Sequence, residues 1–161
     1  LGKVVNDISI LTKLQLTYSS ILSIHIWLNK NKLEKTFYGL INSKVHWVFN
    51  HGTHLTLVIS DANGIIELTK EELFEIAVEE LNKYLNISRK EIRNYKVLKE
   101  KRATYVPSND IIGDRPFTIT EFTNFLLAGD WVETGLPSTI ESAVFSGRIA
   151  AEIIISNQGR N

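Results

Sequence analysis

The sequence of 161 residues contains no cysteine and no methionine. The absence of cysteine excludes disulfides, thiolate zinc sites and a cysteine nucleophile, and it fits a reducing compartment. A natural full-length chain starts with methionine, whereas this sequence starts with Leu1 and shows no charged-then-apolar pattern of a signal peptide. We therefore expect the sequence to be a piece of a longer protein.

Net charge and long apolar runs are also missing. The 18 basic residues balance 18 acidic ones, so no electrostatic field favours a polyanion, and nucleic acid is not an expected partner. The longest apolar clusters, such as residues 153–155, are far shorter than the roughly 18 to 20 residues that a membrane-spanning helix needs. A hydrophobic content of 43% nevertheless suffices for a domain with a substantial core.

A glycine fingerprint for dinucleotides, G-x-G-x-x-G, is absent, because no two of the nine glycines are two residues apart. The chain also lacks a phosphate-binding loop, a Ser-His-Asp order and a zinc-ligand pattern. Hydrolytic chemistry therefore has no support, and a dinucleotide could not be held through its pyrophosphate by this chain alone.

Hydrophobic patterning predicts an antiparallel sheet in the first 105 residues. Residues 20–29 carry sizeable side chains on both faces, which is typical of a central strand. Three short β-branched and aromatic runs, separated by turn residues, predict a meander over residues 36–41, 45–49 and 55–60. A longer strand is predicted over residues 95–105.

A helix is predicted between the meander and the last strand. Thr69 and Glu72 have the spacing of a capping box, and apolar residues recur on one face until about Leu85. The opposite face, over residues 71–79, is acidic, and we interpret it as a solvated surface rather than a pair of catalytic carboxylates.

The C-terminal third is organised around Gly129 and Asp130. The apolar residues 125–127 predict a buried strand that ends at this glycine and carboxylate. Ser138 as N-cap, with Glu141 three residues later, predicts the start of a helix. A helix start favours negative charge, and Asp130 is suited to accept hydrogen bonds from ligand hydroxyls.

Small residues recur on one side of this predicted helix, so that a ligand could approach its backbone closely. They are Ala143, Gly147 and Ala151, with Ser142, Ser146 and Ala150 alongside. Spacing alone leaves open the alternative that these residues only allow the helix to pack on a sheet.

The segment LAGDWVETGLPSTIESAVFSGRIAAE (residues 127–152) resembles the C-terminal flavin-binding motif of the FAD-dependent amine oxidase and carotenoid desaturase superfamily. Within it, GDW followed by TGLP is similar to the squalene-associated branch, the hydroxysqualene dehydroxylases. Three further segments resemble that branch: SILSIHIWLN (20–29), KVHWVFN (44–50) and EKRATY (100–105). Ser142 departs from the motif, which usually has glycine there.

The resemblance implies an α+β fold: an antiparallel substrate-domain sheet with helices, and the C-terminal strand-helix segment of an FAD-binding α/β domain. Residues 1–105 would belong to the substrate-binding domain and residues 106–161 to the FAD-binding domain, joined by a linker within residues 107–117. Asp130 would contact the ribityl chain, and the helix start would face the flavin ring. The predicted cofactor-binding residues are Gly129, Asp130, Trp131, Gly135, Leu136, Pro137, Ser138 and Glu141.

The resemblance also implies an oxidoreductase that acts on a long, hydrophobic isoprenoid, with reductive dehydroxylation of hydroxysqualene to squalene as the expected reaction. The missing N-terminal FAD-binding region would be the chain's partner. The implied location is the cytoplasm, with peripheral contact at the inner membrane surface. Two alternatives stay open: a non-catalytic binding or assembly module, and a flavin desaturase or amine oxidase with another substrate.

Trp27, Trp47 and Phe49 are candidates for lining an apolar substrate cavity, although core packing is the more frequent use of such residues. Lys101 and Arg102 could bind a leaving group, with a solvated strand face as the alternative. The histidines at 46, 51 and 54 could offer imidazoles to a metal, but no acidic or cysteine ligand is placed near them, and solvated histidines at a hairpin are expected instead.

Overall fold

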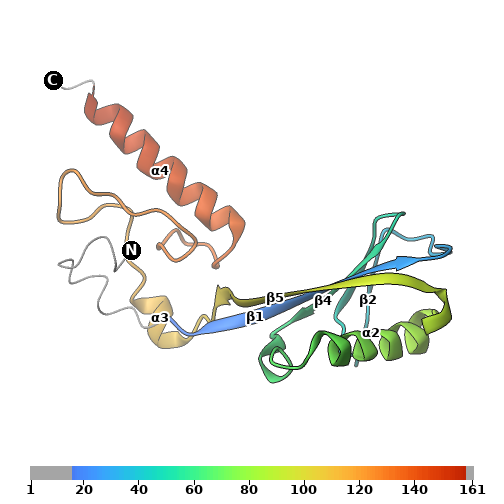
Figure 1. Cartoon of the computed structure of the whole chain (residues 1–161). Helices are drawn as coiled ribbons and strands as arrows, with labels where there is room; N and C mark the ends of the chain where they lie inside the picture. Colours follow the sequence, from blue (N-terminus) through green and yellow to red (C-terminus); the bar gives the residue numbers. More distant parts are fainter. Residues whose placement is uncertain (1–15, 159–161) are drawn as a thin grey trace. The chain divides into compact units, whose positions relative to one another are not determined.

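The computed structural model describes residues 16–158. These residues form two compact units (Figure 1). One unit is Tyr18–Thr104, and the other contains Thr17 and the residues from Tyr105 onward. Each unit is described separately below.

The first unit is built on a five-stranded sheet with the order β2-β3-β4-β1-β5. The second, third and fourth strands follow one another as the predicted meander, and each pairs antiparallel with the next. The strand bounds are β1 Tyr18–Leu28, β2 Phe37–Gly39, β3 Trp47–Asn50, β4 Leu55–Ser60 and β5 Ile92–Tyr105.

Strand β1 is central, as its sequence predicts, and begins two residues before the predicted start at residue 20. It pairs antiparallel with β4, with His25 opposite Thr56. On its other side lies β5, and the backbone N–H of Asn29 donates to the carbonyl of Glu91 at 2.8 Å. Since the end of β1 thereby meets the start of β5, the two strands run antiparallel, and the whole sheet is antiparallel.

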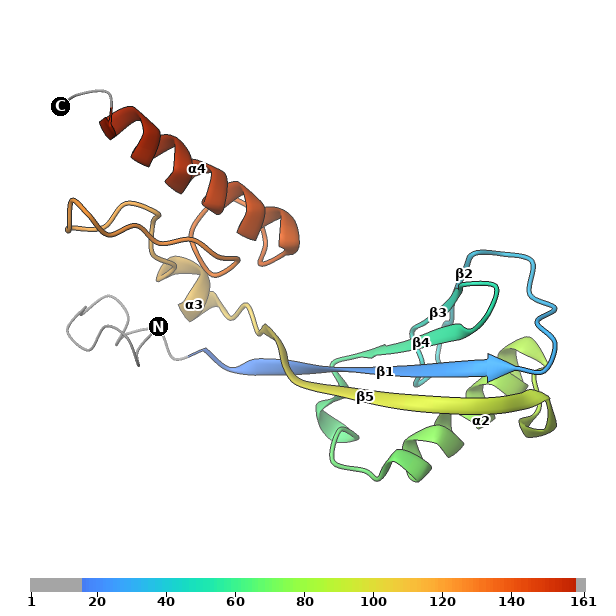
Figure 2. The ribbon, with the colours of Figure 1, turned by 45° about the horizontal axis from the view of Figure 1, so that its top comes forward.

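Helix α2, Lys70–Leu85, covers one face of this sheet (Figure 1 and Figure 2). Its apolar stripe, which includes Leu73, Ala77 and Leu81, belongs to the same buried core as Ile24 of β1 and Leu57 of β4. Because strand side chains alternate, the residues between these buried positions point to the opposite face. The acidic residues 71, 75 and 79 are exposed, which confirms the predicted solvated surface.

The predicted capping box at the start of α2 is confirmed. The Thr69 hydroxyl accepts from the Glu72 N–H at 3.2 Å, and the Glu72 carboxylate accepts from the Thr69 N–H at 2.8 Å. We expect Thr69→Ala to lower the free energy of unfolding by about 1 kcal/mol, because the first turn loses its side-chain acceptor. Chemical denaturation followed by circular dichroism measures this. Thr36→Ala, at an exposed position, is the control, and an equal effect there would refute the cap's contribution.

The second unit contains α3, Asn109–Gly113, and α4, Ile140–Gln158. The short α3 lies within the predicted linker. The prediction of a buried strand over residues 125–127 is wrong: Leu126 forms only an isolated antiparallel bridge with Ile119. A strand needs a continuous neighbour, and this segment meets its partner only around residues 118 and 119, where the Leu127 N–H donates to the Thr118 carbonyl. Leu127 itself is buried.

The structure is thus a mixed α/β fold around a five-stranded antiparallel sheet, as predicted at the coarse level. That residues 106–161 belong to an FAD-binding domain remains a prediction. Within residues 16–158, no helix is both long and apolar enough to cross a bilayer.

Candidate functional site

Gly129 forms the turn that precedes the last helix, and only glycine fits there. Its φ angle is +147°, and a Cβ atom at this position would lie 2.4 Å from the indole nitrogen of Trp131. Such a contact is far inside van der Waals distance, so any other residue would displace the Trp131 ring or the turn. Glycine therefore allows the backbone to turn directly before Asp130.

Asp130 is half-buried, and its carboxylate is held by Ser138, whose hydroxyl donates to Oδ2 at 2.5 Å. Its other oxygen, Oδ1, makes no hydrogen bond within the described part of the chain. One side of the carboxylate is thus fixed by the protein, while the other is able to accept a hydrogen bond from a ligand hydroxyl.

The predicted N-cap at Ser138 is wrong, because the structure places the cap one residue later. The Thr139 hydroxyl accepts from the Ser142 N–H at 3.3 Å, and the Thr139 carbonyl accepts from the Ala143 N–H. Ser138 cannot cap the helix while its hydroxyl binds Asp130. Glu141 is exposed and forms no capping box with Ser138 among the described residues.

The start of α4 is open. Ile140 is 86% exposed, and the backbone N–H groups of Ile140 and Glu141 have no acceptor in the described part of the chain. These groups and the positive end of the helix dipole favour a negatively charged or acceptor group at this point. Pro137, just before the helix, is exposed.

The small side of α4 packs mainly on the chain's own turn, so the predicted open stripe is only partly present. Ser142 and Ser146 are both fully buried. Ser142 lies 2.7 Å from the Thr134 hydroxyl, and Ser146 accepts from the Gly129 N–H at 2.9 Å. At Gly147, by contrast, a Cβ atom would meet nothing within 4 Å, and Ala151 is exposed, so there is room beside the helix backbone at these positions.

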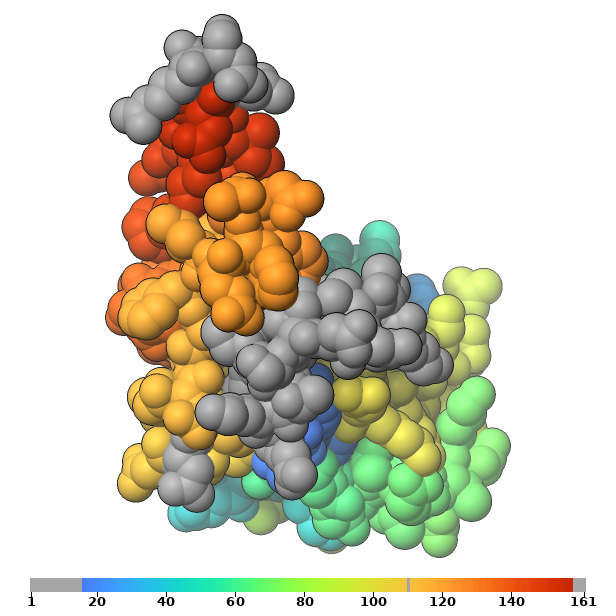
Figure 3. Space-filling view, turned by 90° about the vertical axis from the view of Figure 1, so that its left-hand side faces the viewer, coloured from blue at the N-terminus to red at the C-terminus, as the bar shows by residue number. Residues whose placement is uncertain are grey.

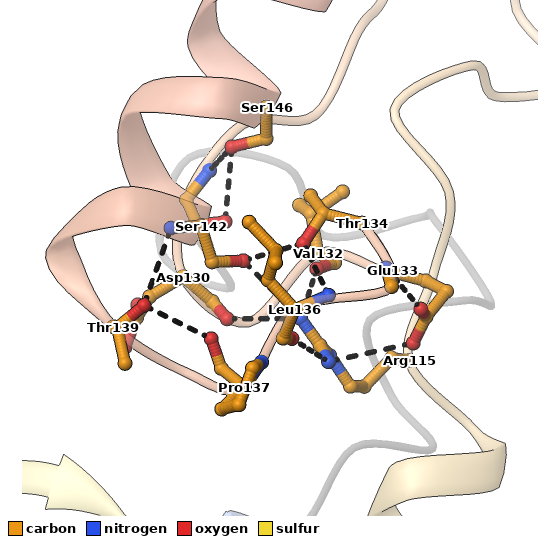
Figure 4. Close-up of polar contacts among 12 residues, drawn as sticks. Arg115, Asp130, Val132, Glu133, Thr134, Leu136, Pro137, Thr139, Ser142 and Ser146 are labelled. Carbon is orange, nitrogen blue, oxygen red and sulfur yellow. Dashed lines mark hydrogen bonds and ion pairs between the residues drawn. The ribbon is translucent and has the colours of Figure 1, made fainter.

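Arg115 forms hydrogen bonds to several backbone carbonyls of the turn at residues 130–136 (Figure 4). Its guanidinium donates to the carbonyls of Leu136 at 2.9 Å, of Asp130 at 3.2 Å and of Val132. Its side chain is only 6% exposed and lies 3.4 Å from the carboxylate of Glu133. Sequence reasoning missed this residue, although it is the only basic residue between positions 102 and 148.

A groove of about 540 Å³ lies beside the second half of α4, in the same unit. Its walls are residues 123–126 on one side and Ala150, Ile153, Ile154 and Asn157 on the other. In Figure 3 the orange loop is adjacent to the red end of α4. The second half of α4 therefore also has accessible apolar side chains, at Ala150, Ile153 and Ile154.

The sheet face opposite α2 carries the predicted aromatic residues. Trp47 is 43% exposed and stacks on Phe49, with ring centroids 6.4 Å apart. Phe37 lies directly opposite Phe49 across the strand pair and is also exposed. Trp27 is half-buried on β1, where its ring stacks on His54. None of the four belongs to the buried core, so core packing does not explain them.

Lys101 and Arg102, the candidates for binding a leaving group, both contact other side chains of the chain. Lys101 pairs with Glu67 at 2.6 Å, and the Arg102 guanidinium lies over the Tyr18 ring. No cluster of three or more histidine or acidic residues suited to a metal occurs in the part of the chain that the structure describes. His54 is half-buried rather than solvated.

The chain belongs to the flavin-containing amine oxidoreductase family, which matches residues 10–155. The cofactor of this family is FAD. The fold is similar to that of a solved structure: a protein from Exiguobacterium sp. 255-15 assigned as a protoporphyrinogen oxidase superposes with a TM-score of 0.68 at 13% identity, over 99% of this chain and 39% of that one.

The chain is also similar to two characterised kinds of enzyme. The hydroxysqualene dehydroxylase of Zymomonas mobilis is 31% identical over 87% of this chain, which spans 34% of that protein. The 15-cis-phytoene desaturase of Narcissus pseudonarcissus is 26% identical over 85% of this chain, which spans 27% of that protein. The chain thus spans about a third or less of the length of these relatives.

The described residues fit one end of such a cofactor. Oδ1 of Asp130 has no protein partner in the described chain, and the N–H groups of Ile140 and Glu141, which follow Ser138 by two and three residues, have no acceptor there. The pyrophosphate end has no counterpart, since the glycine fingerprint is absent. That residues 129–141 form part of an FAD site, and which of them contact the cofactor, remain predictions.

Proposed function

We propose that this chain is the C-terminal part of an FAD-dependent oxidoreductase that acts on a long isoprenoid, and that its reaction is the reductive dehydroxylation of hydroxysqualene to squalene. The similarity to hydroxysqualene dehydroxylases over most of the chain supports the substrate. The proposal that this chain contacts FAD depends on one observation, the state of the Asp130 carboxylate. Ser138 donates to one of its oxygens, while the other has no hydrogen-bond partner within the described chain.

In this proposal the turn and the helix start hold the flavin end of FAD. Asp130 accepts a hydrogen bond from a ribityl hydroxyl, and the Ile140 and Glu141 N–H groups stabilise negative charge on the ring. When bound and reduced, FAD supplies a hydride. Arg115 keeps the turn in shape through its three carbonyl contacts, and Gly129 allows the turn to form.

The exposed aromatic residues of the sheet are proposed to bind the isoprenoid. Trp47 and Phe49, with Trp27 on β1, offer flat apolar surface that a polyene can cover without leaving polar groups unpaired. Covering this surface also removes water from the ligand, which a hydride transfer requires. An isoprenoid of this length is stored in membranes, so we also propose peripheral membrane contact.

The region that precedes this chain in the complete protein is proposed to cover α4. Val144, Ile154 and Ile155 are between 50% and 69% exposed on this helix, and the groove beside residues 150–157 is partly lined by apolar side chains. Apolar surface of this extent usually marks an interface. The relatives are about three times longer than the matched segment, which leaves ample chain for this contact.

An assay with the complete protein tests the proposal. FAD-loaded protein is incubated without oxygen, with its flavin reduced for hydroxysqualene, and with its flavin oxidised and a quinone present as electron acceptor for phytoene and for an amine. Dehydroxylation needs a reduced flavin that supplies hydride while the hydroxyl group leaves as water, whereas removal of hydrogen from phytoene or an amine needs an oxidised flavin. Products are identified by mass spectrometry. We expect squalene from hydroxysqualene and no turnover of the other two. The present chain alone, which lacks the glycine fingerprint, serves as the control without flavin. Formation of a desaturated product from phytoene, with hydroxysqualene untouched, would contradict the proposed substrate.

The similarity to a phytoene desaturase favours one alternative, an isoprenoid desaturase that uses the same cofactor site. This alternative predicts a substrate without a hydroxyl group. The same assay separates the two, because only the dehydroxylation removes oxygen from the substrate.

A further inference from the structure

A polar pair interrupts the aromatic face of the sheet. The register places Phe37, Phe49, Thr56 and His25 side by side in one row across four strands. Trp27 lies two residues beyond His25 on β1, and its ring centroid is 6.4 Å from that of His25. His25 and Thr56 therefore form the polar end of this row, with Phe49 next to Thr56 across the sheet and Trp27 next to His25 along β1.

His25 is held in place by Thr56 but keeps one ring nitrogen available. Its Nδ1 lies 3.1 Å from the Thr56 hydroxyl oxygen. Its Nε2 has no hydrogen-bond partner within the described residues. Depending on the tautomer, Nε2 either donates to or accepts from a ligand, and an alcohol can take both roles. The pair thus presents one hydrogen-bonding position to whatever covers this face.

The surroundings of His25 favour its neutral form. Burial lowers the pKa of His25 below its ordinary value, and the neighbouring His54, Lys96 and His51 lower it further. The His54 ring lies 5.8 Å from that of His25 and stacks between Trp27 and His51. A neutral imidazole can be covered by an apolar ligand at much lower cost than a charged one, provided that its free nitrogen finds a partner.

We infer that His25 and Thr56 form a subsite for the hydroxyl group of an isoprenoid alcohol within the aromatic wall. This inference rests on the proposed function and adds to it the means of telling an alcohol from a hydrocarbon. A pure hydrocarbon that covers the row leaves Nε2 of His25 dry and unpaired, whereas an alcohol of the same skeleton supplies the missing hydrogen bond. The subsite therefore selects hydroxysqualene over squalene or phytoene.

Binding to the complete, FAD-loaded protein tests the subsite independently of turnover. Dissociation constants are measured for hydroxysqualene and for squalene, both delivered from cyclodextrin, by quenching of tryptophan fluorescence. We expect the wild-type protein to bind the alcohol about tenfold more tightly, the size of effect that one neutral hydrogen bond in a desolvated site gives. His25→Phe should reduce this ratio to about one, because it keeps a flat aromatic side chain and removes both ring nitrogens.

Thr56→Val is the second variant, since it keeps the branched shape in the strand and removes only the hydroxyl that orients His25. We expect it to reduce the alcohol preference to about half or less. Thr36→Val, which removes a hydroxyl at an exposed position outside this row, is the matched control and should leave the ratio unchanged.

The outcomes separate the subsite from the proposed reaction. An unchanged ratio in both His25→Phe and Thr56→Val, an equal loss of affinity for both ligands, or a wild type without preference would each overturn the subsite. If the protein still converts hydroxysqualene to squalene in those cases, the proposed reaction is supported and only the proposed subsite is refuted. A preference that is lost in His25→Phe, in a protein that does not convert hydroxysqualene, would support the subsite and refute the reaction.

Discussion

Replacing Asp130 by alanine in the complete protein is expected to weaken FAD binding by roughly 10- to 100-fold, the range for loss of a hydrogen bond to a charged acceptor. The reason is geometric: Ser138 holds one carboxylate oxygen at 2.5 Å, and the other is the acceptor left over for a ligand. The measurement is the ratio of flavin to protein absorbance after purification, followed by titration of the apoprotein with FAD.

Asp114→Ala is the matched control, because Asp114 carries the same charge at an exposed position outside the turn. It should retain the wild-type flavin content. Ser138→Ala should give an intermediate loss, since the Asp130 carboxylate remains but is no longer held by a donor. Wild-type flavin content in Asp130→Ala would remove this carboxylate from the cofactor site.

Replacing Arg115 by methionine is expected to have the largest effect on stability. The change keeps an unbranched side chain but leaves three carbonyls without their donor and Glu133 without its partner. Each unsatisfied buried group is costly, so we expect the free energy of unfolding to fall by about 3 kcal/mol or more. Flavin content should fall as well, because Asp130 and Leu136 lie on the turn that Arg115 holds. Thermal unfolding and flavin absorbance measure the two effects.

Arg148→Met is the control for loss of one positive charge. Arg148 pairs with Glu152 on the exposed surface of α4, where such a pair contributes only about 0.3 to 0.5 kcal/mol. Arg115→Lys should lie between wild type and Arg115→Met, since a single ammonium cannot reach all three carbonyls at once. Equal stability of Arg115→Met and Arg148→Met would show that the turn does not depend on this arginine.

The features that sequence predicts correctly here are local. The Thr69 capping box and the extent of α2 follow from neighbouring residues on one helix, and the central position of β1 follows from side chains on both of its faces. The meander follows from turn residues between short runs. The capping box depends on interactions within a few residues, while the strands can be predicted because each carries its own apolar and turn pattern.

The features that sequence misses depend on contacts between distant residues. Ser138 has the right spacing for an N-cap, but Asp130 takes its hydroxyl, and Thr139 caps the helix instead. Arg115 carries no periodic signal and becomes important only because the chain folds residues 130–136 around it. The polar pair on the sheet is likewise invisible until the register places His25 opposite Thr56.

The failed strand prediction over residues 125–127 has a related cause. The apolar run has the composition of a buried strand, yet the described chain gives it only a single bridge, between Ile119 and Leu126. A strand forms where a neighbour offers backbone groups along its length, and residues 118 and 119 offer them only to Leu126 and Leu127.

The most direct test of the account is a crystal structure of the complete protein with FAD bound. The account predicts that a ribityl hydroxyl of FAD lies within about 2.5 to 3.0 Å of Oδ1 of Asp130, with the flavin ring next to the start of α4. A structure in which Asp130 contacts only protein, while FAD lies away from residues 129–141, would contradict it.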